Sequence, residues 1–209
     1  MLEGVDAQLD RLAAAVGSIE QEFGLKDGFL LDLGKGDDWS FVIKMHALIE
    51  AMVSHLLTHA IGDTRLSEFF ERLELSNPRT GKIVVAGMLE LLEGPERRFI
   101  RLVSELRNRL VHNVRNVNFD LQTYYDGLDK NQRQGFLDGA SWWYSPGSSD
   151  LVGALKNNPQ SILWFALLSL IVRISDRLSV AKGRNQKLQD ILDFLSGDGA
   201  GEIPPNPTA

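Results

Sequence analysis

Apolar residues recur at steps of three and four along most of this 209-residue chain, a spacing typical of amphipathic α-helices. No segment alternates apolar and polar residues in the way that a half-buried β-strand does. The pattern therefore predicts an all-α fold, an antiparallel bundle of four or five helices. The first apolar stripe is formed by Leu2, Val5, Leu9, Leu12, Val16, Ile19 and Phe23.

Turn and cap residues divide the rest of the chain into further helices. A glycine-rich break at residues 24–36 precedes Asp37 and Asp38, and both are suitable N-caps for a helix over residues 39–61. Pro95 stands where the first turn of a helix favours proline. The other predicted helices cover residues 67–73, 81–92, 95–115, 159–180 and 184–195.

Residues 116–158 have a different composition, rich in Asn, Asp, Gly and Gln, and they contain all three tyrosines. We expect an irregular insertion before the penultimate helix, with short helical pieces such as residues 131–137. Residues 197–209 are rich in Gly and Pro, which predicts a disordered tail. The chain is therefore expected to form one helical domain over residues 1–196.

Composition excludes several classes of protein. With no cysteine, the chain can form no disulfide, thiolate metal site or cysteine nucleophile. The first residues are acidic where a signal peptide would be basic. The longest apolar stretch, residues 162–172, falls short of the roughly 20 residues that a membrane-spanning helix needs. We expect a cytoplasmic protein with no membrane segment.

The charge is uneven along the chain. The net charge is −6, which argues against broad, nonspecific binding to nucleic acid. Residues 96–115, however, contain six arginines and two acids, a local balance of +4 that leaves −10 for the remainder.

This helix has two contrasting faces. With Arg107 at zero and a turn of about 100° per residue, apolar residues fall between about 220° and 340°. Between about 60° and 140° lie Arg97, Arg101, Ser104, Asn108, His112 and Arg115. A solvent-exposed face of an ordinary surface helix would look the same. The alternative is a site for chemistry on phosphate.

Arg107 and His112 are suited to metal-independent cleavage of RNA. A histidine with a pKa near 6.5 can remove the proton of the ribose 2′-OH, and an arginine can stabilise the charge on the phosphate oxygens. Asn108 could orient the imidazole or hold a phosphate oxygen. The products would be a 2′,3′-cyclic phosphate and a 5′-hydroxyl.

The segment from Arg107 to His112, RNRLVH, resembles the signature of the HEPN ribonuclease superfamily, an arginine followed after four to six residues by histidine. Residues 39–115, with LRNRLVH at their end, are particularly similar to bacterial mannitol-operon-repressor-like proteins. The resemblance implies a helical bundle that dimerises, so that two motifs form one composite site from both subunits. It also implies Arg107, Asn108 and His112 as catalytic residues, and we expect Arg101, Arg109 and Arg115 to bind the substrate.

Three functions are compatible with these observations. The first is an endoribonuclease, in this superfamily usually a toxin with an antitoxin partner or a phage-defence effector. The second is a non-catalytic regulator that binds another protein. The third is a dimeric scaffold in which Arg97, Arg101 and Arg115 pair with acids of a partner. No cofactor is expected.

Other polar and aromatic residues have structural interpretations beside functional ones. Glu50, if buried, needs a partner, for which Arg107 or Arg109 is the expected residue; a supporting role at the site is the alternative. His55 and His59 have the spacing of a metal-binding pair, but no metal site is predicted, because core-edge histidines are the commoner case. The aromatic residues of the insertion could stack on bases, although packing is favoured.

Overall fold

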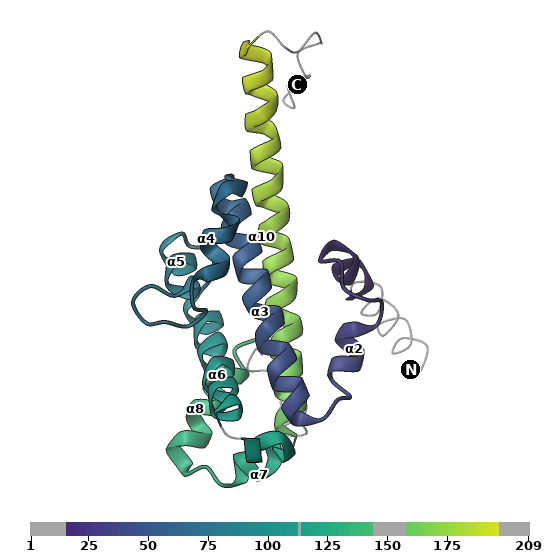
Figure 1. The fold of residues 1–209 in the computed structure, drawn as a ribbon, viewed down its shortest axis with the longest axis vertical. Helices are drawn as coiled ribbons and strands as arrows, with labels where there is room; N and C mark the ends of the chain where they lie inside the picture. The colour runs from purple at the N-terminus through teal and green to yellow at the C-terminus, as the bar shows by residue number, and fades with distance from the viewer. Residues whose placement is uncertain (1–15, 113, 144–157, 197–209) are drawn as a thin grey trace.

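The computed structural model describes residues 16–112, 114–143 and 158–196, which form a helical bundle without any β-strand in those ranges (Figure 1). The predicted all-α bundle is thus confirmed. Residues 16–22 are helical. The later elements are α2 (Phe29–Leu33), α3 (Asp38–Ile61), η1 (Thr64–Leu66), α4 (Ser67–Arg72), α5 (Lys82–Met88), α6 (Gly94–Val111), η2 (Val114–Asn118), α7 (Leu121–Asp126), α8 (Lys130–Ala140) and α10 (Pro159–Ser196).

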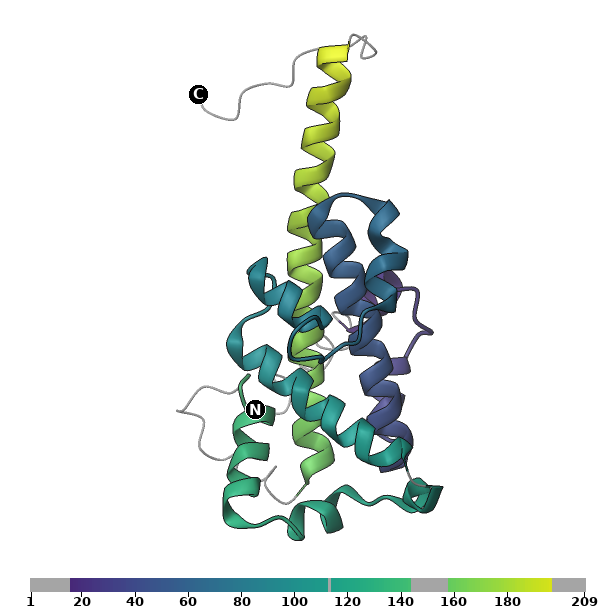
Figure 2. The same cartoon turned by 60° about the vertical axis from the view of Figure 1, so that its left-hand side comes forward.

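Three long helices, α3, α6 and α10, enclose the core. Helices α3 and α10 run in the same direction, because Gln160 Nε2 donates to the Gly36 carbonyl at one end and Asn185 Nδ2 donates to the His59 carbonyl at the other. Helix α6 runs antiparallel to both and crosses them obliquely (Figure 2). The fully buried side chains of the core include Phe41, Met45, Ile49, Leu56, Phe99, Ile100, Val103, Leu163, Leu167, Leu170, Ile174 and Leu178.

Helix α3 begins and ends at the residues expected from its caps. The Asp37 carboxylate accepts a hydrogen bond from the Ser40 amide, and Gly62 ends the helix with a φ of 78°. By length and composition alone, α3 could also span a membrane, but 61% of its most apolar window is buried within the protein. The apolar side chains of α3 therefore serve the bundle core.

The helix predicted for residues 81–92 is shorter than expected and ends at Met88. Glu90 has a φ of 57°, in the left-handed region that non-glycine residues seldom occupy. This conformation turns the chain so that the amides of Leu91 and Leu92 both donate to the Ala86 carbonyl. A local C-terminal cap, which periodicity does not reveal, therefore ends α5.

The two helices predicted for residues 159–180 and 184–195 are one helix, α10, so the predicted break between them is wrong. Gly183 is helical and exposed. A glycine inside a helix costs only about 1 kcal/mol, and contacts on its C-terminal side outweigh this. There Arg184 Nη2 donates to the Ala60 carbonyl, and Asn185 Nδ2 donates to the His59 carbonyl at 2.7 Å.

The predicted irregular insertion contains two ordered helices, α7 and α8, that pack on the bundle. The Tyr125 and Phe136 rings meet edge to face, with centroids 5.3 Å apart, and both side chains are buried. Gly139 of α8 lies close against Leu102 of α6. The aromatic residues of this region thus contribute to packing, as favoured from the sequence. Residues 1–15, 144–157 and the predicted tail 197–209 lie outside the described residues.

Candidate functional site

The N-terminus of α6 is held firmly by its own cap and by α10. Glu93 and Glu96 form a capping box, in which the Glu96 carboxylate accepts from the Glu93 amide at 2.7 Å. Glu96 is completely buried, and Arg177 Nη1 lies 2.9 Å from both of its carboxylate oxygens. Arg173 also reaches Glu96, at 3.5 Å. These contacts fix the direction of the helix that carries the candidate motif.

The polar face predicted for α6 is divided in the structure, because neighbouring helices cover part of it. Ser104 is buried and donates to the Ile100 carbonyl. Arg97 is half-buried against α5, where its guanidinium occupies the space above Gly87. Arg101, Asn108 and His112 are exposed, as expected.

The helix predicted to reach residue 115 ends at Val111, so Arg115 lies in η2 and not on the stripe of α6. The Asn116 side-chain amide donates to the Arg109 carbonyl at 2.7 Å, which satisfies a carbonyl left open at the end of the helix. Arg115 is exposed. The expected grouping of Arg115 with the other arginines on one helical face is therefore wrong.

Arg107 and His112 project from different sides of α6. Five residues at about 100° each separate them by about 140° around the axis. His112 is exposed at the C-cap, with φ −84° and ψ −5°, close to helical values. Arg107 is half-buried, and its Nη1 donates to Asn108 Oδ1 at 3.1 Å. Asn108 is one turn before His112 and on the same side of the helix. Within one chain, Arg107 therefore contacts a residue on the His112 side of the helix, Asn108.

On its own side, Arg107 faces a charged cluster between α3 and α5. Lys82 is buried, and its Nζ lies 3.0 Å from Glu50 Oε1; His46 Nδ1 lies 3.9 Å from Glu50 Oε2. Burial is the main reason that the pKa of His46 is below its usual value, and the positive charges of Arg107 and Lys82 lower it further, against the effect of Glu50. The partner of Glu50 is therefore Lys82, and the expectation of Arg107 or Arg109 is wrong.

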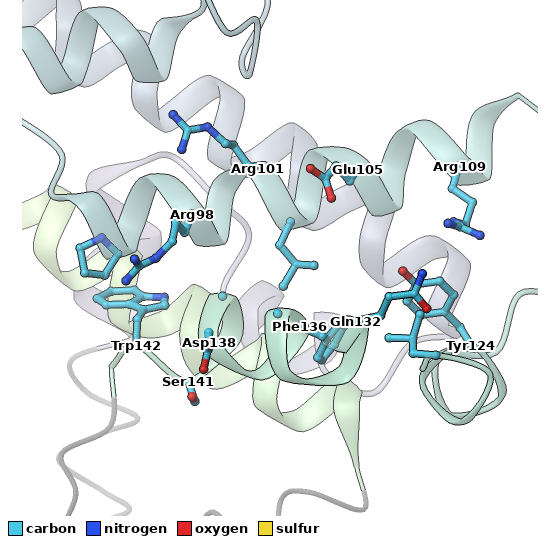
Figure 3. A pocket seen from close by; sticks show the side chains of 15 residues that line it. Arg98, Arg101, Glu105, Arg109, Tyr124, Gln132, Phe136, Asp138, Ser141 and Trp142 are labelled. Atoms are coloured by element: carbon cyan, nitrogen blue, oxygen red, sulfur yellow. The ribbon is translucent and has the colours of Figure 1, made fainter. Parts of the chain in front are cut away.

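On the opposite side, a groove of about 880 Å³ runs between α6 and α8 (Figure 3). Arg98, Arg101 and Arg109 line one wall, spaced so that they share one face of α6. Glu105 and Asp138 also line it, so the groove has both signs of charge with one positive charge in excess. By its angle on the helix, His112 lies on this face, one turn beyond Arg109.

Aromatic rings close the two ends of the groove. Arg109 lies over the Tyr124 ring, with Cζ 5.1 Å from its centroid. At the other end, the Trp142 ring packs beneath Arg98, and Trp142 Nε1 is buried without a hydrogen-bond partner (Figure 3). Arg173 also lies over the Trp142 ring, with Cζ 5.0 Å from its centroid. The groove is therefore lined by guanidinium groups and by two aromatic rings, each with an arginine against it.

Of the residues that line the groove, only Arg101 and Arg109 were among the predicted site residues; Arg98, Gln132 and Trp142 are examples of those that were not. The sequence contained a partial signal, because residues 98, 101, 105 and 109 follow helical spacing. The contribution of α8 could not be read from the sequence, since it depends on how the insertion folds back onto α6.

Two histidines of α3, His55 and His59, pack against each other. The His55 and His59 rings meet edge to face, with centroids 4.3 Å apart. Partial burial lowers the pKa of both histidines, and proximity to Lys182 lowers it further. Within the described ranges, no cluster of three or more His, Asp or Glu residues has the arrangement of a metal site.

Comparisons with known proteins leave the family open: no family model, no curated protein and no solved structure matches this chain.

Proposed function

We propose that the protein is a metal-independent endoribonuclease whose reaction centre is His112, at the end of the arginine-lined groove. The observation that carries the proposal is that His112 shares a face of α6 with Arg101 and Arg109, both of which line the groove. The proposal agrees with the HEPN-like motif and does not depend on a metal.

In the proposed reaction, the neutral imidazole of His112 removes the proton of a ribose 2′-OH. The 2′-oxygen attacks the adjacent phosphorus, and the bond from phosphorus to the 5′-oxygen breaks. The imidazolium returns its proton to the departing 5′-oxygen, which leaves a 2′,3′-cyclic phosphate and a 5′-hydroxyl. Arg109, one turn before His112, is the nearest guanidinium on that face to stabilise the phosphate oxygens.

We further propose that Arg107 is a positioning residue within one chain. Its Nη1 donates to Asn108 Oδ1, and Asn108 lies one turn before His112. A composite site in which Arg107 meets the His112 of a second subunit remains the prediction of the HEPN resemblance. Arg101 and Arg98 would hold the RNA backbone farther along the groove, on the other side of Glu105 from His112.

The substrate best suited to the groove is unpaired RNA. The Tyr124 and Trp142 rings lie at its ends and could stack on bases that are not already stacked in a duplex. The acidic remainder of the chain disfavours nonspecific binding of long duplexes, so binding would depend on the groove. A cytoplasmic toxin restrained by a protein antitoxin would be a suitable setting.

The test is incubation of the purified protein with total RNA and tRNA in EDTA, followed by analysis of the ends. We expect cyclic-phosphate and 5′-hydroxyl ends from the parent, and none from His112→Ala. His55→Ala is the matched control, because His55 is an exposed histidine on α3 that does not line the groove. Equal cleavage by parent and His112→Ala would refute the proposal.

A second candidate is a non-catalytic regulator that binds a protein. The divergence of Arg107 and His112 around α6 favours it, since an inactive relative need not bring the two side chains together. No cleavage by the folded parent, together with a protein partner lost on Arg101→Glu substitution, would support this function.

A further inference from the structure

Glu105 is an acidic residue on the arginine-bearing wall of the groove between α6 and α8. It lies one helical turn from Arg101 and one turn from Arg109, a spacing at which ion pairs commonly form. Neither pair forms here. Arg109 lies over the Tyr124 ring instead, and the exposed Glu105 carboxylate has no hydrogen bond or ion pair with any residue that the structure describes. Two acceptor oxygens therefore face α8 across the groove (Figure 3).

The second acid of the groove, Asp138, differs in having a partner, because it accepts a hydrogen bond from Gln134 Nε2 at 2.7 Å. A carboxylate without a partner repels phosphate, so Glu105 weakens a groove that holds only the backbone of RNA. Recognition of a base gives this carboxylate a favourable role, since its oxygens can accept hydrogen bonds from the N–H groups of the base.

Gln132 contributes a donor from the facing wall. Its side-chain oxygen accepts from the Asp129 amide at 3.0 Å, as part of the capping box of α8. This bond leaves the Nε2 donor of Gln132 without a partner among the described residues. Gln132 lies on the α8 side of the groove, between Phe136 and Tyr124 (Figure 3). The groove thus presents two acceptor oxygens from α6 and one amide donor from α8.

Gly135 keeps the groove open one turn after Gln132. A glycine within a helix is less stable than an alanine. Packing does not require a glycine at this position, because an added Cβ would meet no atom within 4 Å. A Cβ at Gly139, one turn later, would come within 3.2 Å of Leu102. The missing side chain of Gly135 therefore leaves space in the groove that a planar base can occupy.

We propose that the groove recognises an unpaired guanine, with Glu105 as the residue that determines specificity. The two Glu105 oxygens accept from N1–H and from the 2-amino group of guanine, and Gln132 Nε2 donates to O6. Guanine is the RNA base with two adjacent donors beside an acceptor on its Watson–Crick edge. Arg101 and Arg109, one turn to either side of Glu105, hold the phosphates on the two sides of the nucleotide. The inference rests on the proposed function, in which this groove binds RNA.

The other three bases fit this arrangement less well. Adenine and cytosine each present a single amino group beside a ring nitrogen that accepts, so one carboxylate oxygen would face an acceptor. The single N–H of uracil lies between two carbonyl oxygens, which repel the carboxylate. Exchange of the base therefore tests the role of Glu105 directly.

The test measures binding without cleavage, by fluorescence anisotropy of labelled RNA on the full-length His112→Ala variant. The probes are short oligouridines with one central guanosine, adenosine or cytidine, beside an oligouridine of the same length. We expect the RNA with guanosine to bind at least about 10-fold more tightly than the others, as for other bidentate contacts with a base. Inosine, which lacks the 2-amino group, should lose most of this preference.

Three substitutions in the same background locate the contact. Glu105→Gln replaces one acceptor oxygen by a donor and should abolish the preference for guanosine. Asp138→Asn is the matched control, because it removes the same charge from the same groove and should keep the preference. Gly135→Leu should weaken binding of the guanosine RNA about 10-fold without lowering Tm, since leucine favours a helix more than glycine does. Circular dichroism checks that each variant is folded.

Four outcomes would overturn guanine recognition by Glu105. They are equal binding of the four RNAs, no binding of any of them, a preference for guanosine that survives Glu105→Gln, and guanosine binding unchanged by Gly135→Leu. The proposed ribonuclease is tested separately by cleavage with the parent protein. A preference for guanosine without cleavage would refute the ribonuclease and retain guanine recognition, whereas cleavage without a base preference would do the reverse.

Discussion

Arg107 donates a hydrogen bond from Nη1 to Asn108 Oδ1, 3.1 Å away, so the first two polar residues of the candidate motif are joined within one chain. Arg107 at the same time faces the cluster of His46, Glu50 and Lys82, since its charge contributes to the lowered pKa of His46. The guanidinium therefore lies between a buried charged cluster and the exposed residue that precedes His112 by one turn.

If Arg107 acts through Asn108, the two residues should behave as a unit. We expect Arg107→Ala and Asn108→Ala each to lower kcat roughly 10-fold to 100-fold with little change in KM, through misplacement of His112. The double variant should lose no more than either single variant. The NMR chemical shifts of the His112 ring should change in the same way in both variants. Additive losses would instead indicate independent roles.

Removal of the two charges of the Glu50–Lys82 pair, one at a time, should reduce the free energy of unfolding by different amounts. Lys82 has 2% of its side chain exposed and Glu50 has 36%. Glu50→Gln leaves a buried ammonium without its carboxylate and should reduce the free energy of unfolding by about 3 kcal/mol. Lys82→Met leaves a carboxylate that can reach water and should cost about 1 kcal/mol.

Denaturant unfolding of the two single variants and the double variant measures this asymmetry. The double variant should be more stable than Glu50→Gln alone, because it removes both charges. Glu68→Gln is the control, since Glu68 and Arg72 form a pair on the surface, and its effect should stay below about 0.5 kcal/mol. A larger loss for Lys82→Met than for Glu50→Gln would contradict the burial argument.

Glu96 links the cap of α6 to α10, and its charge can be removed without removing the cap. Glu96→Gln keeps an oxygen that can accept from the Glu93 amide but weakens the contacts with Arg173 and Arg177. We expect a loss of about 3 kcal/mol in the free energy of unfolding, because two arginines lose their buried carboxylate. Glu93→Gln, at a side chain 60% exposed, should lose below about 1 kcal/mol.

The histidines of α3 predict a dependence of stability on pH. Burial holds the pKa of His46, His55 and His59 below 6.5 in the folded protein. The unfolded chain therefore binds more protons than the folded chain once the pH falls below about 6.5. Stability should be fully present above that pH and should decline as the pH falls from 7 to 5. His46→Asn should reduce the slope, and an unchanged slope would exclude His46 as a contributor.

If the groove binds RNA, substitutions in it should weaken RNA binding with little effect on the rate of cleavage. Trp142→Ala and Tyr124→Ala remove the stacking surfaces and should raise KM roughly 10-fold, as expected for about 1–3 kcal/mol per stacked base, with little effect on kcat. Arg101→Ala should weaken binding and reduce its salt dependence. Arg72→Ala, in α4 and away from the groove, is the control for loss of an arginine. A fall in kcat with an unchanged KM would instead indicate that these residues act in the cleavage step and not in RNA binding.

The sequence by itself determined the helical class, the N-cap Asp37, the start of α6 beside Pro95 and the position of α3. These features depend on capping and on apolar spacing, which act within a few residues along the chain. The core face of α6 could be predicted from the sequence for the same reason. The HEPN-like motif and its residue roles stay a prediction.

Only the tertiary structure decided which residues that are far apart in the sequence contact one another. It paired Glu50 with Lys82, continued α10 through Gly183 and folded α8 against α6 to form the groove. It also covered part of the polar face of α6 with α5. Each of these outcomes depends on contacts between residues far apart in the sequence, whose energies outweigh a glycine in a helix or a local periodicity.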